Sequence, residues 1–265
     1  MSTPRIDRAV RRVGSPVASA AVAAVALAGC SAPVSGSDHA TTRHTVVVLA
    51  ASSLTEALAA IAKDFEASHA GTNIQLSFAA SSTVVTQVNQ GAPADLIALA
   101  GTSAMGPLNT SRVAKDGTRS LASNTLEIAT PPSNPGNVNA ITDLSRPTLK
   151  VVLCAATVPC GKAAGRALSA AGVVAHVVSY ETDVKAALAK VQLGEADAAI
   201  VYHSDLVSAG VRVRGVQIPA SVNQTLDYPL VRLTDDPTTV EFMTYVLSDQ
   251  GQKHLRDAGF MTAGS

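Results

Sequence analysis

Aromatic side chains are scarce in this 265-residue chain, which has no tryptophan and only 3% aromatic residues. Alanine and valine therefore carry most of the 47% apolar content, a composition that suits helices packed closely on a parallel sheet. So large an apolar fraction excludes a disordered protein, and it can supply the core of one large domain or two small ones.

The chain also lacks an excess of basic residues, because 20 Lys and Arg balance 20 Asp and Glu. Four of the Arg and one Asp lie in residues 1–29, so the remainder holds 16 basic and 19 acidic residues, a formal charge of −3. No basic patch indicates a nucleic-acid surface. We therefore expect no nucleic-acid partner.

Only one apolar run is long, and it covers residues 17–29 after a segment that is rich in arginine. This order is typical of a secretory leader, predicted here as residues 1–29. The leader ends in Leu27-Ala28-Gly29-Cys30, which resembles the bacterial lipobox and predicts lipidation of Cys30. An ordinary cleaved signal with an incidental cysteine is the alternative.

The leader motif predicts where the protein resides. No second apolar run is long enough to span a bilayer, so we expect a protein held by its lipid on the extracytoplasmic face of the cell membrane. Residues 30–43 are polar and without hydrophobic period, and they are predicted to form a flexible tether.

Strands and helices alternate after the tether. β-branched or alternating apolar residues predict strands, and apolar residues at helical spacing predict helices. The first run comprises strands at residues 45–50, 74–78 and 95–100 and helices at residues 54–69 and 81–89. This order indicates an α/β fold with a parallel sheet.

A second α/β run follows and indicates a second lobe. Its predicted elements are strands at residues 125–130, 150–155, 175–179 and 198–202 and helices at residues 161–171 and 183–193. A strand at residues 228–233 and a helical stretch at residues 238–257, broken near Gly251, complete the chain. We predict that residues 44–122 and 225–265 form lobe 1, and that residues 123–224 form lobe 2.

Four turns share one feature: a strand ends, small residues follow, and a helix begins. They are Ala51-Ser52-Ser53, Ala80-Ser81-Ser82-Thr83, Val158-Pro159-Cys160-Gly161 and Thr182-Asp183-Val184. Each offers free backbone N–H groups and the positive end of a helix dipole. If the turns meet at the carboxyl edge of the sheet, they form an anion site. The alternative is that Ser and Asp there are plain helix caps.

The segments that carry these turns have a family resemblance. VLAASSLT (48–55), SFAASST (77–83), QGAPADL (90–96), VPCG (158–161), DV (183–184) and IVY (200–202) resemble the periplasmic molybdate-binding proteins (ModA) of ABC transporters. The likeness runs from about Thr45 to Phe260. It implies a two-lobed periplasmic binding protein of type II, with a cleft between lobes of parallel or mixed sheet.

The resemblance also implies the ligand and the residues that hold it. Ser53 and Ser81 would give hydroxyl and backbone donors, Cys160 and Val184 their N–H groups, and Tyr202 its phenol. Such neutral donors suit a deprotonated dianion, molybdate or tungstate, whose oxygens only accept hydrogen bonds. We expect no direct metal ligand, no cofactor and no catalysis. The expected partner of this monomer is a membrane permease.

Cys160 departs from the family, which usually has a small residue such as Ala at this position. Cys154 and Cys160 form an even pair in an oxidising compartment, so a disulfide between them is one interpretation. A free Cys160 at a helix N-terminus is the other, and it would make the chain a secreted thiol enzyme. No convincing base accompanies that thiol.

Three further alternatives remain. Sulfate suits the same donors, and a ligandless envelope lipoprotein would leave the turns as caps. Hydrogen phosphate needs an acceptor for its proton, and the motif turns hold only Glu56 and Asp183 as carboxylates.

The six histidines show no zinc-site spacing, and we assign His203 a surface or loop role. Tyr202 could instead pack inward as a strand residue.

Overall fold

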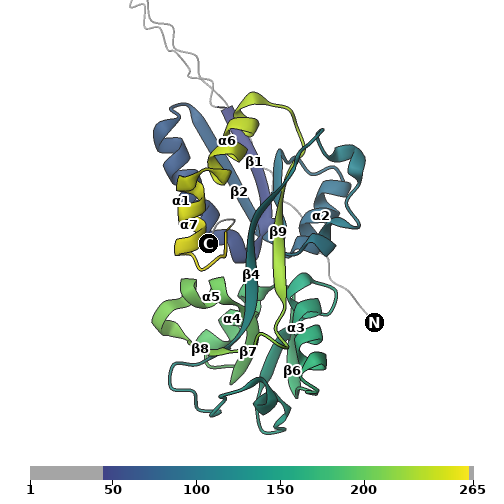
Figure 1. The fold of residues 1–265 in the computed structure, drawn as a ribbon, viewed down its shortest axis with the longest axis vertical. Helices are drawn as coiled ribbons and strands as arrows, with labels where there is room; N and C mark the ends of the chain where they lie inside the picture. The colour runs from purple at the N-terminus through teal and green to yellow at the C-terminus, as the bar shows by residue number, and fades with distance from the viewer. Residues whose placement is uncertain (1–43, 263–265) are drawn as a thin grey trace, which may run out of the picture. The chain divides into compact units, whose positions relative to one another are not determined.

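Residues 44–262, the part of the chain that the computed structural model describes, fold into a nine-stranded mixed sheet with helices packed against it (Figure 1). The predicted leader, Cys30 and the tether lie outside these residues. The strands are β1 (His44–Ala51), β2 (Thr72–Ala79), β3 (Leu96–Ala98), β4 (Thr118–Thr130), β5 (Val151–Cys154), β6 (Val177–Glu181), β7 (Ala198–Tyr202), β8 (Arg214–Gln217) and β9 (Thr225–Arg232).

The α-helices of the described residues are α1 (Thr55–Ser68), α2 (Ser81–Asn89), α3 (Pro159–Ala170), α4 (Val184–Gln192), α5 (His203–Ala209), α6 (Pro237–Leu247) and α7 (Asp249–Asp257). Short 3₁₀ turns join several of them, including η1 (Ser52–Leu54), which leads into α1. Within residues 44–262, no helix combines the length and apolar character needed to cross a membrane.

The first group of elements surrounds β1, which pairs in parallel with β2 and β3, while β9 runs antiparallel to β3. Successive side chains of a strand point to opposite faces. Val48 therefore packs in the cluster that holds Phe65 of α1, whereas Leu49 packs in the cluster that holds Val85 of α2. A strand covered on both faces explains the continuous apolar run of β1. We call this group, with α6 and α7, the first lobe.

The second group is built on β5, which pairs in parallel with β6 and β7. Helix α3 packs on β5 and β7, and α4 packs on the same strands. Strand β8 is antiparallel to β4, as is β7. We call this group, with α5, the second lobe. Its sheet is mixed where it meets β4.

Strand β4 belongs to both lobes (Figure 1). Its residues up to Thr125 pair with β9, and from Leu126 onward it pairs with β7. The predicted strand at residues 125–130 was too short, because β4 begins at Thr118 with exposed polar residues that show no hydrophobic pattern. Backbone pairing with β9 holds that segment instead. The predicted lobe boundaries at residues 122/123 and 224/225 stay a prediction.

Two further differences concern helices. The helix predicted at residues 238–257 with a break near Gly251 is interrupted at Ser248, since Ser248 is extended and its hydroxyl accepts from the Gly251 N–H. Gly251 lies inside α7, where a Cβ atom would come 2.4 Å from the Val246 carbonyl oxygen. Helix α5 was not predicted: His203, to which a surface or loop role was assigned, is exposed at the surface and begins this helix.

Candidate functional site

One cavity is lined by residues from both lobes. All five residues predicted to bind an oxyanion line it: Ser53 and Ser81 from the first lobe, and Cys160, Val184 and Tyr202 from the second. The free volume of this cavity is about 10 Å³, counted at the centre of a water molecule. One ordered water needs about this much room.

Three of the helix starts at this cavity lack a side-chain cap. The N-cap residues of η1, α2 and α3 are Ala51, Ala80 and Val158, and none of them caps through a side chain. Ser81 is the first helical residue of α2, so its hydroxyl lies inside the helix start. The interpretation of the serines as plain caps is therefore wrong. These helix starts present N–H groups that no side-chain cap satisfies.

Helix α4 differs, because Asp183 does cap it. The Asp183 Oδ1 accepts from the N–H groups of Lys185 (2.9 Å) and Ala186 (3.1 Å). The N–H of Ala187 donates to the Asp183 carbonyl oxygen. Val184 is the first residue of α4 and comes before these three residues. Asp183 does not accept from its backbone N–H, so this N–H is the donor at the start of α4 that can bind a ligand in the cavity.

The serine hydroxyls of the first lobe have partners within that lobe. Ser81 Oγ accepts from the backbone N–H of Ala100 at 2.8 Å, so its own proton remains for another acceptor. Ser53 Oγ lies 3.0 Å from the hydroxyl of Tyr228, and either group can donate. Ser53 and Ser81 are both buried, which fixes these hydroxyls at the wall of the cavity.

The phenol of Tyr202 has no such partner. Its side chain is 2% exposed, and its hydroxyl makes no hydrogen bond within the described residues. Burial raises the Tyr202 pKa well above its ordinary value, so the phenol keeps its proton and can donate it. A buried hydroxyl without a partner costs free energy. The sequence allowed an inward-packing Tyr202, and the structure places the residue at the cavity wall.

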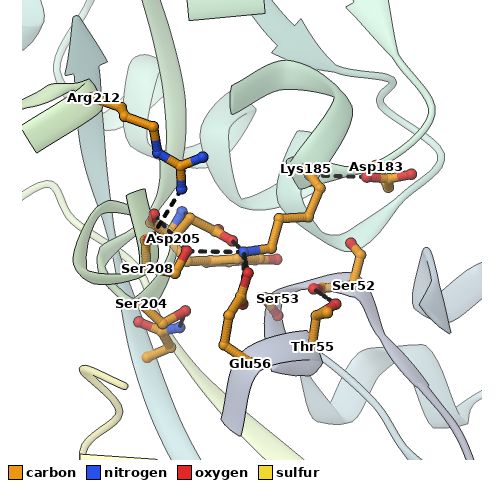
Figure 2. A network of polar contacts seen from close by, with 12 residues as sticks. Ser52, Ser53, Thr55, Glu56, Asp183, Lys185, Ser204, Asp205, Ser208 and Arg212 are labelled. Carbon is orange, nitrogen blue, oxygen red and sulfur yellow. Dashed lines mark hydrogen bonds and ion pairs between the residues drawn. The ribbon is translucent and has the colours of Figure 1, made fainter. Parts of the chain in front are cut away.

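Positive side chains are absent from the described residues that line the cavity, where Asp183 alone carries a charge. Lys185 lies close by, but its ammonium pairs with Glu56 at 2.8 Å and with Asp205 at 3.3 Å (Figure 2). Burial raises the pKa of the Asp205 carboxyl to about 6, and the Lys185 charge opposes this shift. An anion in the cavity would meet neutral donors.

Sequence reasoning missed Lys185 and Asp205. Asp205 accepts from the backbone N–H of Tyr202 at 3.1 Å, which satisfies the first N–H at the start of α5. Its place in the first turn, three residues after Tyr202, is the signal that could have revealed the helix. Lys185 gave no local signal, because its partners lie on α1 and α5.

Cys154 and Cys160 are joined by a disulfide, with Cα atoms 5.8 Å apart. Both residues are buried. In this form neither sulfur is a thiolate, so the arrangement supports no thiol nucleophile.

His203 Nδ1 lies 2.7 Å from Glu127 Oε2, away from the cavity lining. No group of three or more His, Cys, Asp or Glu in residues 44–262 is arranged to hold a metal ion.

Comparisons with known proteins cover almost the whole described chain. The family profile described as "Bacterial extracellular solute-binding protein" matches residues 46–261. The molybdate-binding protein ModA of Mycobacterium tuberculosis is 35% identical over 243 residues, which covers 90% of this chain and 93% of that protein.

Two solved structures share the fold. The periplasmic molybdate-binding protein of Azotobacter vinelandii matches with a TM-score of 0.73 and 18% identity, over 82% of this chain and 99% of that one. The sulfate-binding protein SubI of Mycobacterium tuberculosis matches with a TM-score of 0.72 and 20% identity, over 83% and 88%. The predicted α/β periplasmic binding protein fold is thus confirmed.

Proposed function

The chain belongs to the bacterial extracellular solute-binding proteins and is a homologue of ModA, and from this premise we propose that it binds molybdate for an ABC importer. Tungstate has the same shape and charge, so it is included in the proposal. As a solute-binding protein, the chain is a transport component and not an enzyme. The partner that receives the oxyanion is the membrane permease of the importer.

The observation that carries this proposal is the donor set of the cavity. Ser53 and Ser81 face it from the first lobe, and Cys160, Val184 and Tyr202 face it from the second. A molybdate dianion has only acceptor oxygens, and charge-assisted bonds from N–H and O–H groups are the stronger kind. Helix N-termini add favourable electrostatics without any cationic side chain.

Sulfate is the second candidate, since the same donors suit it and the sulfate-binding protein SubI shares the fold. That likeness is at 20% identity, whereas the ModA protein of Mycobacterium tuberculosis is 35% identical. Hydrogen phosphate is disfavoured, because it needs an acceptor for its proton. Among the described residues that line the cavity, Asp183 is the one carboxylate, and its Oδ1 is engaged by two backbone N–H groups, which leaves Oδ2 as the single acceptor for that proton.

Calorimetric titration of the delipidated protein with molybdate, tungstate, sulfate and phosphate tests the proposal. We expect molybdate and tungstate to bind about a hundredfold or more tightly than sulfate, a difference of about 3 kcal/mol, and phosphate to give no heat. Tighter binding of sulfate would favour the second candidate. No binding of any oxyanion would overturn the function.

The lipid anchor is a separate part of the proposal, based on the leader and on Leu27-Ala28-Gly29-Cys30. Replacing Cys30 by Ser should release the protein or leave it unprocessed, because the thioether that carries the lipid cannot form. Partitioning into a detergent phase measures this change. Equal partitioning of parent and Cys30→Ser would contradict the anchor.

A further inference from the structure

A charged contact joins the lobes beside the cavity (Figure 2). The ammonium of Lys185 on α4 lies 2.8 Å from both carboxylate oxygens of Glu56 on α1. Lys185 belongs to the second lobe and Glu56 to the first. Among the ion pairs formed within residues 44–262, this is the pair that connects the two lobes.

The contact joins two of the helix starts that face the cavity. Glu56 lies in the first turn of α1, three residues after Ser53. Lys185 directly follows Val184, and its backbone N–H is fixed by Asp183. The approach that brings Ser53 and Val184 to opposite sides of one small ligand is therefore the same approach that forms the ion pair.

The second lobe holds the Lys185 side chain without help from the first. Its ammonium lies 3.0 Å from Ser208 Oγ and 3.3 Å from Asp205 Oδ1, both on α5. The Asp205 side chain is fully buried, whereas that of Glu56 is 49% exposed. If the lobes separate, Glu56 returns to water while Lys185 keeps its buried partner. The bond to Glu56 can therefore break without leaving an unpaired buried charge.

We propose that Glu56 and Lys185 are positioning residues that form a reversible latch, which stabilises the closed cleft and slows release of the oxyanion. The inference rests on the proposed function and adds a means of retention to it. A bond made only in the closed form raises the closed population and with it the apparent affinity. Because the latch does not touch the ligand, it acts equally on every oxyanion that the cavity accepts.

The variant Glu56→Gln tests the latch and leaves the buried contacts of Lys185 intact. We expect the molybdate dissociation rate to rise by about two- to fivefold, as for partly exposed ion pairs. The association rate should change less than about twofold. Tungstate should show the same ratio as molybdate. High salt should shrink the difference between parent and variant, since ions screen an exposed pair.

Glu195→Gln is the matched control. Glu195 pairs with Lys190 at 2.6 Å and is 52% exposed, but both residues lie in the second lobe. Its release kinetics should equal those of the parent. Unchanged dissociation in Glu56→Gln, or the same increase in Glu195→Gln, would overturn the latch.

A second measurement separates the latch from the ligand assignment. Small-angle X-ray scattering of the ligand-free protein at low salt should give a larger radius of gyration for Glu56→Gln than for the parent and for Glu195→Gln. Equal radii would overturn the latch. If the parent binds no oxyanion, the proposed function fails, while this measurement still tests the closing bond.

Discussion

The two walls of the cavity hold their donors in different ways. On the first-lobe wall, Ser81 and Ser53 already bond within their own lobe, to the Ala100 N–H and the Tyr228 hydroxyl. On the second-lobe wall, the Tyr202 hydroxyl is buried without a partner among the described residues. A hydroxyl of the first wall therefore serves the fold as well as the ligand, whereas the Tyr202 hydroxyl adds no hydrogen bond to the described part of the fold.

Ser81→Ala should have the largest effect, because it removes two interactions at once. Loss of a donor to a charged oxygen should weaken molybdate binding by about ten- to a hundredfold. The buried N–H of Ala100 loses its acceptor as well, which should lower the free energy of unfolding by about 1 to 3 kcal/mol. Calorimetric titration and urea unfolding of the ligand-free protein measure the two losses.

Ser133→Ala, at an exposed position in the proline-rich loop, is the control and should change neither quantity. If Ser81→Ala binds molybdate as tightly as the parent while remaining folded, Ser81 does not contact the ligand. A loss of affinity without any loss of stability would remove the contrast between the walls.

Tyr202→Phe should weaken binding by a similar factor, about ten- to a hundredfold, but without the cost to the fold. The ligand-free variant should be as stable as the parent, or more stable by about 1 kcal/mol, since an unpaired buried hydroxyl is gone. Thermal unfolding with and without molybdate separates the two effects. Tyr180→Phe, at an exposed tyrosine on β6, is the matched control. Clear destabilisation of ligand-free Tyr202→Phe would show that its hydroxyl does support the fold.

The buried charge of the second lobe should make stability depend on pH. The Asp205 pKa is raised from 3.8 to about 6, so the folded protein binds this proton more tightly than the unfolded chain. Its contribution favours folding below about pH 4 and is lost as the pH rises through about 6, a change of about 2 kcal/mol between pH 4 and pH 7.

Chemical unfolding of the parent and of Asp205→Asn across this range, at constant ionic strength, measures that contribution as a difference. The stability of the parent relative to the variant should fall as the pH rises. A difference that stays constant between pH 4 and pH 7 would mean that Asp205 titrates near its ordinary pKa.

Removing the disulfide should affect the fold more than the ligand. Cys154 and Cys160 are six residues apart, and closing so short a loop contributes about 2 kcal/mol in the chain-entropy account. The double variant Cys154→Ala/Cys160→Ala should lose about that much stability, measured in urea. Its affinity for molybdate should change less than about threefold, since the proposed contact is the backbone N–H of residue 160. A loss as large as that of Tyr202→Phe would show that the bridge shapes the site.

The regular elements could be predicted where their apolar residues repeat with a period. The sequence patterns predicted α2 at residues 81–89 and β7 at residues 198–202 with the bounds that the structure has. They shortened β4 and missed α5. The first residues of β4 are polar and exposed, and α5 is one short helix that begins directly at the end of β7. In neither segment do apolar residues recur over enough positions to show a helical or strand period.

The sequence by itself determined the order of strands and helices, and it placed small and hydroxyl-bearing residues at helix starts, because these features follow from neighbours within a few positions. The tertiary structure decided which donors are already satisfied and which charges meet. Lys185 and Glu56 are 129 residues apart, and Ser81 Oγ accepts from the distant N–H of Ala100. Such contacts depend on the sheet register and on how the helices pack, which no local periodicity reports.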